Sequence, residues 1–200
     1  ESTTWSARCG GAEHVVRGAP MSAERFMDDS TLDEQTSIVG GRRTDAEHIV
    51  QRLGELGWTI GIAESLTGGE VCSQLVAVAG ASKVVRGGIV AYATALKQSL
   101  LGVDPLVLEL GGPVQAKVAR QMAEGVREAV AVDGAGADVG VATTGIAGPT
   151  SSDGQPVGTV FVAVSTPLGT RVELLQLDGD REQIRQRTAR RALRMVLEAL

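Results

Sequence analysis

A serine stands at the predicted junction between a buried strand and a helix. The segment is Ala63-Glu64-Ser65-Leu66-Thr67-Gly68-Gly69, between a predicted strand over 59–63 and a predicted helix over 67–78. A turn of this kind exposes a side chain at the carboxyl edge of a sheet, beside the N–H groups that begin a helix. It suits a nucleophilic serine or an anion-binding site. The alternative is an ordinary helix cap, because Ser and Thr are common capping residues.

A tyrosine and a lysine stand at a second predicted strand-to-helix junction, in Tyr92-Ala93-Thr94-Ala95-Leu96-Lys97. A lysine whose pKa is lowered by burial acts as a general base, and a tyrosine hydroxyl relays protons. The alternative is a surface pair whose long side chains lie along apolar surface. Short-chain dehydrogenases also use Ser, Tyr and Lys, but they need a Tyr-x-x-x-Lys spacing, and four residues separate Tyr92 from Lys97. The two histidines, His14 and His48, lie outside these motifs, which argues against a Ser-His-Asp triad.

A glycine-rich loop follows a third predicted strand, in Thr143-Thr144-Gly145-Ile146-Ala147-Gly148-Pro149. Glycines let the backbone approach a ligand, and consecutive amides cradle a phosphate or an oxyanion. A plain turn is the alternative. The arginines of the last predicted helix are typical of a solvated face, although Arg181 and Arg185 at its start would also reach a phosphate or a partner subunit.

The spacing of apolar residues predicts the elements that position these motifs. A capping box at Thr44 and Glu47 begins the first helix, which Gly57 ends. Strands and helices then alternate, and a hairpin comes late. This order predicts a three-layer α/β sandwich with a mixed, mostly parallel sheet flanked by helices. The other expected elements are strands over 84–92 and 138–143, helices over 94–101, 106–110, 115–132 and 180–200, a loop over 145–158 and hairpin strands over 157–165 and 170–177.

The composition limits the other possibilities. Only 2% of the 200 residues are aromatic, so the core must be aliphatic, and the net charge of −5 argues against nucleic-acid binding. No apolar run is long enough to span a membrane and no signal peptide is recognisable, so the cytoplasm is expected. Residues 1–43 are predicted to be a flexible leader, in which Met21 is a candidate start, and residues 44–200 a single domain. The two distant cysteines, Cys9 and Cys72, predict no disulfide framework.

The three motifs, in this order and spacing, resemble the CinA C-terminal-domain family of nicotinamide-nucleotide amidases. Further matching pieces are Ala-Gly-Ala-Ser at 79–82, Leu-Gly-Val at 101–103, Met-Ala-Glu-Gly at 122–125, Pro-Val-Gly-Thr-Val at 156–160 and Gly-Asp-Arg at 179–181. The chain departs from the family pattern in three places. Thr94 stands where Asn is usual, Gly112-Pro113-Val114-Gln115 where Gly-Ala-Val-Ser is usual, and Thr150-Ser151-Ser152-Asp153-Gly154 where a more glycine-rich loop is usual. Larger members carry a further N-terminal domain. A chain of 200 residues has no room for one, so it is expected to be the stand-alone form.

The resemblance implies hydrolysis of nicotinamide mononucleotide to nicotinate mononucleotide and ammonia in pyridine nucleotide salvage. It implies no metal and no cofactor, a small nucleotide as substrate, no nucleic-acid or membrane partner, and a homodimer. Ser65 would be the nucleophile, Lys97 the base and Tyr92 a proton relay. The residues expected to bind substrate are Glu64, Thr67, Gly68, Gly69, Thr144, Gly145, Ile146, Ala147 and Gly148. The alternative is a non-catalytic nucleotide-binding or interaction module linked to competence and the DNA-damage response.

Overall fold

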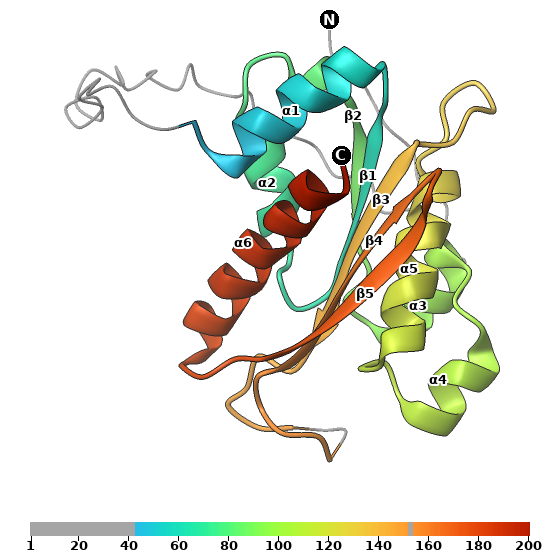
Figure 1. Cartoon of the computed structure of the whole chain (residues 1–200). Helices are drawn as coiled ribbons and strands as arrows, with labels where there is room; N and C mark the ends of the chain where they lie inside the picture. The colour runs from blue at the N-terminus through green and yellow to red at the C-terminus, as the bar shows by residue number, and fades with distance from the viewer. Residues whose placement is uncertain (1–42, 152–153) are drawn as a thin grey trace, which may run out of the picture. The chain divides into compact units, whose positions relative to one another are not determined.

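In the part of the chain that the structure describes, five strands form one sheet (Figure 1). The structure is a computed structural model, and it describes residues 43–151 and 154–200. Across the sheet the strands lie in the order β2-β1-β3-β4-β5. Their bounds are β1 Ile60–Glu64, β2 Val85–Val90, β3 Val139–Gly145, β4 Thr159–Thr166 and β5 Gly169–Gln176.

The sheet is mixed, as expected. β1 lies between β2 and β3 and runs parallel to both. β4 is antiparallel to its neighbours β3 and β5, so it alone of these strands runs against the common direction. The predicted late hairpin is β4–β5. Three adjacent strands therefore bring their carboxyl ends to the same edge of the sheet.

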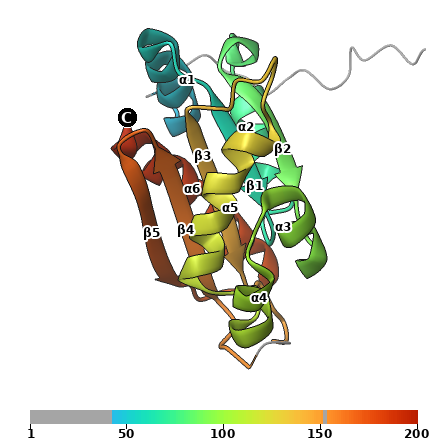
Figure 2. The same cartoon turned by 90° about the vertical axis from the view of Figure 1, so that its right-hand side faces the viewer.

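Helices cover both faces of this sheet and complete the expected three layers (Figure 2). One face carries α1 Asp45–Leu56, α2 Glu70–Val76 and α6 Arg181–Ala199, and the other carries α3 Thr94–Leu101, α4 Pro105–Gly111 and α5 Ala116–Ala129. A short 3₁₀ turn, η1, spans Ala81–Lys83. None of the helices described is both long and apolar enough to cross a membrane.

The first and last helices begin with reciprocal caps. At α1, Glu47 N–H donates to the Thr44 hydroxyl and Thr44 N–H donates to the Glu47 carboxylate, at 3.2 and 2.7 Å. Asp180 and Gln183 make the same exchange at α6. Each box satisfies two amides that a helix otherwise leaves unbonded. The predicted capping box at Thr44 is confirmed, and Gly57 ends α1 in the left-handed conformation.

The core on each face of the sheet is aliphatic. Fully buried residues on the α1, α2 and α6 side include Ile49, Leu53, Ile62, Leu75 and Ile184, and those on the α5 side include Val103, Val118, Met122 and Val126. The backbones of α3 and α5 approach closely at Gly125. A Cβ there would lie 1.8 Å from the carbonyl oxygen of Leu101, so only glycine fits.

Some boundaries differ from those expected, and one difference matters for the site. α2 begins at Glu70 rather than Thr67, because Gly68 and Gly69 have φ angles of 64° and 103°, outside the helical range. Residues 65–69 are therefore a turn between β1 and α2, and Ser65 directly follows the strand. The helix expected over 115–132 ends at Ala129. The predicted leader lies outside the described residues apart from Arg43.

Candidate active site

The carboxyl ends of β1, β2 and β3 lie side by side in register. Glu64, the last residue of β1, pairs with Val90 of β2 on one side and with Thr143 of β3 on the other. The residues that follow these three positions therefore meet at one edge of the sheet, the lower edge in Figure 1. The three predicted motifs follow these positions, so the sheet brings them together.

Ser65 and Lys97 are in direct contact at this edge. Lys97 Nζ donates to Ser65 Oγ at 3.1 Å and to the Ala91 carbonyl at 2.7 Å. Lys97 is 1% exposed and Ser65 8%. Side chains on a helix lean toward its N-terminus, so Lys97 in the first turns of α3 reaches back to the end of β2. A buried amine that contacts a serine hydroxyl is the arrangement that a serine nucleophile with a lysine base requires.

Tyr92 lies near this pair but mainly faces solvent. It is 61% exposed, and its hydroxyl accepts a hydrogen bond from Arg181 Nη2 at 3.0 Å. Arg181 Nη1 also donates to the Gly148 carbonyl at 2.7 Å. Arg181, the first residue of α6, thus joins the β2–α3 junction to the glycine-rich loop.

A cavity of about 270 Å³ opens beside the Ser65 hydroxyl. The predicted catalytic residues Ser65, Tyr92 and Lys97 all line it, as does the whole of Thr144–Gly148 from the predicted binding set. Its other lining residues are Leu66, Thr94, Pro113, Val114, Thr150 and Arg181. The Thr144 hydroxyl donates to the Pro113 carbonyl at 2.8 Å, which fixes the 113–114 segment against the end of β3.

Four residues expected to bind substrate do not line this cavity. Thr67 bonds its hydroxyl to that of Thr143 at 2.7 Å in the interior. The Glu64 carboxylate is 1% exposed and accepts from the backbone N–H groups of Gly69, Val71 and Cys72 at 2.8–3.2 Å. Glu64 therefore occupies the anion-binding position at the start of α2. The alternative of an anion-binding site at this helix start does not fit the geometry, because an internal carboxylate already accepts from these three N–H groups.

Thr94 and Gln115, two of the residues that depart from the family pattern, lie in different surroundings. Thr94 is one of the residues that line the cavity. Gln115 does not line it, and its amide group donates to the carbonyls of Val107 and Gly112, both at 2.8 Å. Of these two positions, Thr94 is therefore the one that alters the cavity lining.

Sequence reasoning missed some of the lining. Leu66, Pro113, Val114 and Thr150 were not expected in the cavity. Pro113 and Thr150 stand in segments where the chain departs from the family pattern, and these departures were the available signal. Arg181 was expected mainly on a solvated face, with phosphate binding as the alternative. Its position directly after the capping residue Asp180 was the sign that it lies at the start of the helix.

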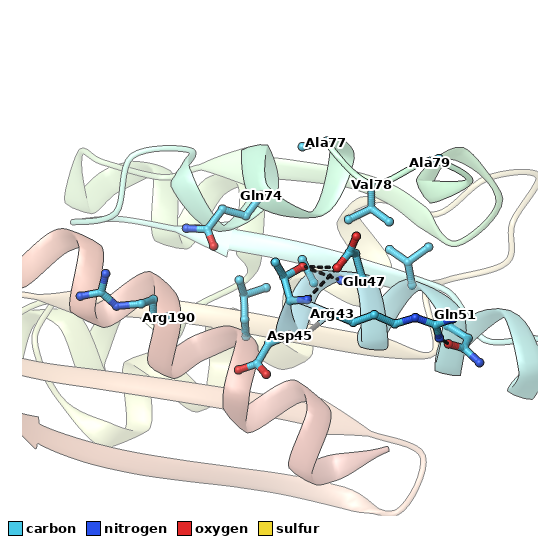
Figure 3. A pocket seen from close by; sticks show the side chains of 13 residues that line it. Arg43, Asp45, Glu47, Gln51, Gln74, Ala77, Val78, Ala79 and Arg190 are labelled. Atoms are coloured by element: carbon cyan, nitrogen blue, oxygen red, sulfur yellow. Dashed lines mark hydrogen bonds between the residues drawn. The ribbon is translucent and has the colours of Figure 1, made fainter. Parts of the chain in front are cut away.

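A second, larger hollow of about 820 Å³ lies beside the N-terminal end of α1 (Figure 3). It is lined from α1 by residues such as Glu47 and Gln51, from the α2 segment by Gln74 and Val78, and from α6 by Arg190. None of the described residues that line it is a serine, cysteine, histidine or lysine. The Glu47 carboxylate is already used by the α1 cap. The candidate catalytic residues therefore line the smaller cavity beside Ser65 and not this hollow.

The thiol of Cys72 lies on α2, just after the turn that carries Ser65. Burial raises the pKa of the Cys72 thiol, and the nearby Glu64 carboxylate adds to this effect. A thiol with a raised pKa is a weak nucleophile at neutral pH. Within 43–151 and 154–200, no three His, Cys, Asp or Glu side chains group in a way that would hold a metal ion.

Comparisons with known proteins agree on one family. Residues 42–200 match the profile of the CinA C-terminal domain. A CinA-like protein of Anaeromyxobacter dehalogenans is 44% identical over 153 residues, which are 76% of this chain and 36% of that protein. The chain spans little more than a third of the length of such curated relatives.

Solved structures match over most of their own length. The competence/damage inducible protein CihA of Agrobacterium tumefaciens is 34% identical, with a TM-score of 0.69 over 80% of this chain and 98% of that chain. A competence-damaged protein (CinA) superfamily protein of Escherichia coli is also 34% identical, with a TM-score of 0.71 over 82% and 96% of the two chains.

Proposed function

Because the chain belongs to the CinA C-terminal domain family, we propose that it hydrolyses the carboxamide group of nicotinamide mononucleotide. The products are nicotinate mononucleotide and ammonia, a reaction of pyridine nucleotide salvage. One observation carries the proposal: the buried Lys97 amine lies 3.1 Å from Ser65 Oγ at the wall of a cavity. This pair supplies a nucleophile and a base without a histidine.

The proposed reaction requires the neutral form of the Lys97 amine, with the contact reversed so that the Ser65 hydroxyl donates to the nitrogen lone pair. Proton transfer from Ser65 to this amine is the first step. Ser65 Oγ then bonds to the amide carbon, and the carbonyl oxygen becomes an oxyanion. As the C–N bond breaks, Lys97 returns the proton to the leaving nitrogen and ammonia departs. Water, activated by the same amine, hydrolyses the acyl-enzyme to the carboxylate.

The oxyanion needs hydrogen-bond donors close to Ser65. The N–H of Ser65 itself is used, because it donates to the Thr143 carbonyl at 3.1 Å. The backbone of the 144–148 segment, which lines the same cavity, is the proposed source of donors. Ile146 N–H is also used, since it donates to Thr159. We therefore assign the role to other amides of this segment.

Arg181 is the proposed contact for the nucleotide phosphate. Its guanidinium group lines the cavity, and two of its nitrogens bond there to Gly148 and Tyr92. Guanidinium groups bind phosphate through paired N–H donors. A cavity of about 270 Å³ with this one arginine suits a small substrate with a single phosphate, and a large polymer would not fit. Tyr92, bonded to Arg181, is the proposed proton relay.

We also propose a homodimer and a cytoplasmic location. Leu96, Leu100 and Leu106, on α3 and α4, are 37–62% exposed, which is a large apolar exposure for neighbouring helices. A second copy would cover such side chains, and sedimentation velocity tests this directly. We propose a cytoplasmic location because the proposed substrate is a nucleotide of the salvage pathway.

The test is ammonia release from nicotinamide mononucleotide by the wild-type chain and by Ser65→Ala. The matched control is Ser73→Ala, an exposed serine on α2. The proposal predicts release by the wild type and the control, and its loss in Ser65→Ala by about 10³-fold or more. Unchanged turnover in Ser65→Ala would overturn the nucleophile assignment.

The second proposed function is a non-catalytic nucleotide-binding or interaction module, and the names of the relatives, which refer to competence and damage, agree with such a role. It predicts that calorimetry detects nicotinamide mononucleotide binding while no ammonia is released. Ammonia release at a rate that depends on Ser65 would exclude it.

A further inference from the structure

The turn that carries Ser65 is held by two side chains of opposite charge. We propose that Glu64 and Arg185 are positioning residues that fix Ser65 Oγ against Lys97. The inference rests on the proposed function, because it assigns these residues a part in the reaction of Ser65. It concerns residues 65–69, which lie between the last residue of β1 and the first of α2.

The Glu64 carboxylate holds the turn and the start of α2 by accepting hydrogen bonds from their N–H groups. Its carboxylate accepts from Gly69 and Val71 at one oxygen and from Cys72 at the other. Its own carbonyl accepts from the N–H of Ala91 at 2.8 Å. Because the Ala91 carbonyl accepts from Lys97 Nζ, the main chain of Glu64 fixes the strand end that also anchors the base. One residue is thus tied to both sides of the Ser65–Lys97 pair.

Arg185 holds the same turn by donating hydrogen bonds to the carbonyl groups of the turn. From α6, its Nε donates to the Leu66 carbonyl at 3.0 Å and its Nη2 to the Thr67 carbonyl at 2.8 Å. The Glu70 carboxylate lies 4.0 Å from the same Nη2. A Cβ on Gly68 would lie 3.5 Å from Nη2, so the guanidinium group packs directly over the glycine.

These contacts replace the regular bonds that the turn lacks. Ser65 N–H still donates to the Thr143 carbonyl of β3 at 3.1 Å, and the Gly69 carbonyl accepts from Ser73 N–H of α2 at 2.9 Å. Residues 66–68 between them belong to neither β1 nor α2, and Gly68 and Gly69 have positive φ angles. Glu64 binds N–H groups of the turn and of the first residues of α2, while Arg185 binds carbonyls of the turn. A buried polar backbone group must be satisfied by some partner, and here charged side chains make the bonds stronger than neutral ones would.

The consequence for catalysis is geometric. Ser65 Oγ has to stay within hydrogen-bond distance of Lys97 Nζ and at attacking distance from the substrate carbon. A displacement of about 1 Å costs about 100-fold in rate. Neither Glu64 nor Arg185 lines the cavity, so losing either should lower kcat and leave substrate affinity almost unchanged.

The test compares Glu64→Gln, Arg185→Met and Arg185→Lys with the control Arg187→Met. Arg187 lies on the same helix and also bonds a carbonyl, that of Asp178, but at the surface. We expect kcat to fall by about ten-fold or more in Glu64→Gln and Arg185→Met, with KM within about two-fold of the wild type. Arg185→Lys should recover part of the loss, because its ammonium group still bonds one of the two carbonyls. The control should retain wild-type kinetics.

Two outcomes would overturn the inference. One is wild-type kcat in folded Arg185→Met, and the other is a raised KM at unchanged kcat, which would make these residues substrate contacts. Two further readouts do not need the natural substrate: the rate at which a fluorophosphonate probe labels Ser65, and amide hydrogen exchange at residues 69–72. If the wild type releases no ammonia, the proposed function fails. Slower labelling in Arg185→Met and faster exchange in Glu64→Gln would still support positioning, while wild-type rates in both readouts would overturn it.

Discussion

Replacing Lys97 with methionine removes the proposed base while leaving the interior filled. Methionine has nearly the length of lysine but no amine, so Lys97→Met loses the contact with Ser65 Oγ and the bond to the Ala91 carbonyl. A positioned general base contributes about 10²–10⁴-fold to rate, which at 1.36 kcal/mol per factor of ten is about 3–5 kcal/mol of transition-state stabilisation. We expect kcat to fall by that factor.

The stability of this variant should change much less than its activity. An unsatisfied Ala91 carbonyl costs about 1–3 kcal/mol. A gain in stability opposes this cost. The variant no longer buries a polar lysine side chain, which is 1% exposed in the wild type, and burying such a group costs free energy. The two effects partly cancel, so the free energy of unfolding should shift by no more than about 2 kcal/mol. A loss of activity in Lys97→Met therefore reports on chemistry rather than on unfolding.

The assay is ammonia release at saturating substrate, with urea unfolding measured on the same preparations. Lys83→Met is the control, because Lys83 is an exposed lysine of η1. If Lys97→Met turns over within about ten-fold of the wild type, Lys97 is not the general base. The reasoning from the 3.1 Å contact would then be refuted.

Three other predictions follow from single contacts. Arg181→Met should raise KM for nicotinamide mononucleotide by about ten-fold or more, as expected for the loss of a phosphate contact, and should leave KM for the riboside, which has no phosphate, almost unchanged; equal changes for both would contradict the phosphate role. Gly125→Ala should lower the free energy of unfolding by about 1–3 kcal/mol or more, because its Cβ would strike the Leu101 carbonyl, whereas Gly54→Ala in α1, with nothing within 4 Å, should be neutral or stabilising in the same thermal melts. The hydrogen bond from Thr44 N–H is the main cause that lowers the pKa of Glu47. The charged form of Glu47 therefore contributes stability above its ordinary pKa, and this contribution is lost as pH falls through the lowered pKa. Tm in acid should depend less on pH in Glu47→Gln than in the wild type, and identical profiles would contradict this.

Much of the fold was predictable because its signals are local. The capping box at Thr44, the glycine that ends α1 and the alternation of strands and helices each follow from neighbouring residues. The strand ends then brought Ser65, Lys97 and the 144–148 segment to one edge, as the parallel topology requires. Predicting that Ser65 and Lys97 are in contact also required the family resemblance, since the pattern alone left Ser65 as either a nucleophile or a helix cap.

The remaining features depend on contacts that no local pattern encodes. Glu64 was expected to bind substrate, but its carboxylate turns inward to the amides of α2, and only the three-dimensional path of the turn decides which way it faces. Arg181 and Arg185 lie more than a hundred residues from the nucleophile turn in sequence, and helix periodicity gives their spacing but not the surface that they meet. In the tertiary structure Arg181 lines the cavity and Arg185 donates to the Leu66 carbonyl of the turn.

The most direct measurement of the central claim is interception of the acyl-enzyme by hydroxylamine during turnover of nicotinamide mononucleotide. If Ser65 forms a covalent intermediate, hydroxylamine competes with water for it. The hydroxamate should then appear at the expense of nicotinate mononucleotide, while hydroxamate and acid together equal the ammonia released. If acid and ammonia are instead formed in equal amounts at every hydroxylamine concentration, with no hydroxamate, then no acyl-serine forms and the account of Ser65 as nucleophile is wrong.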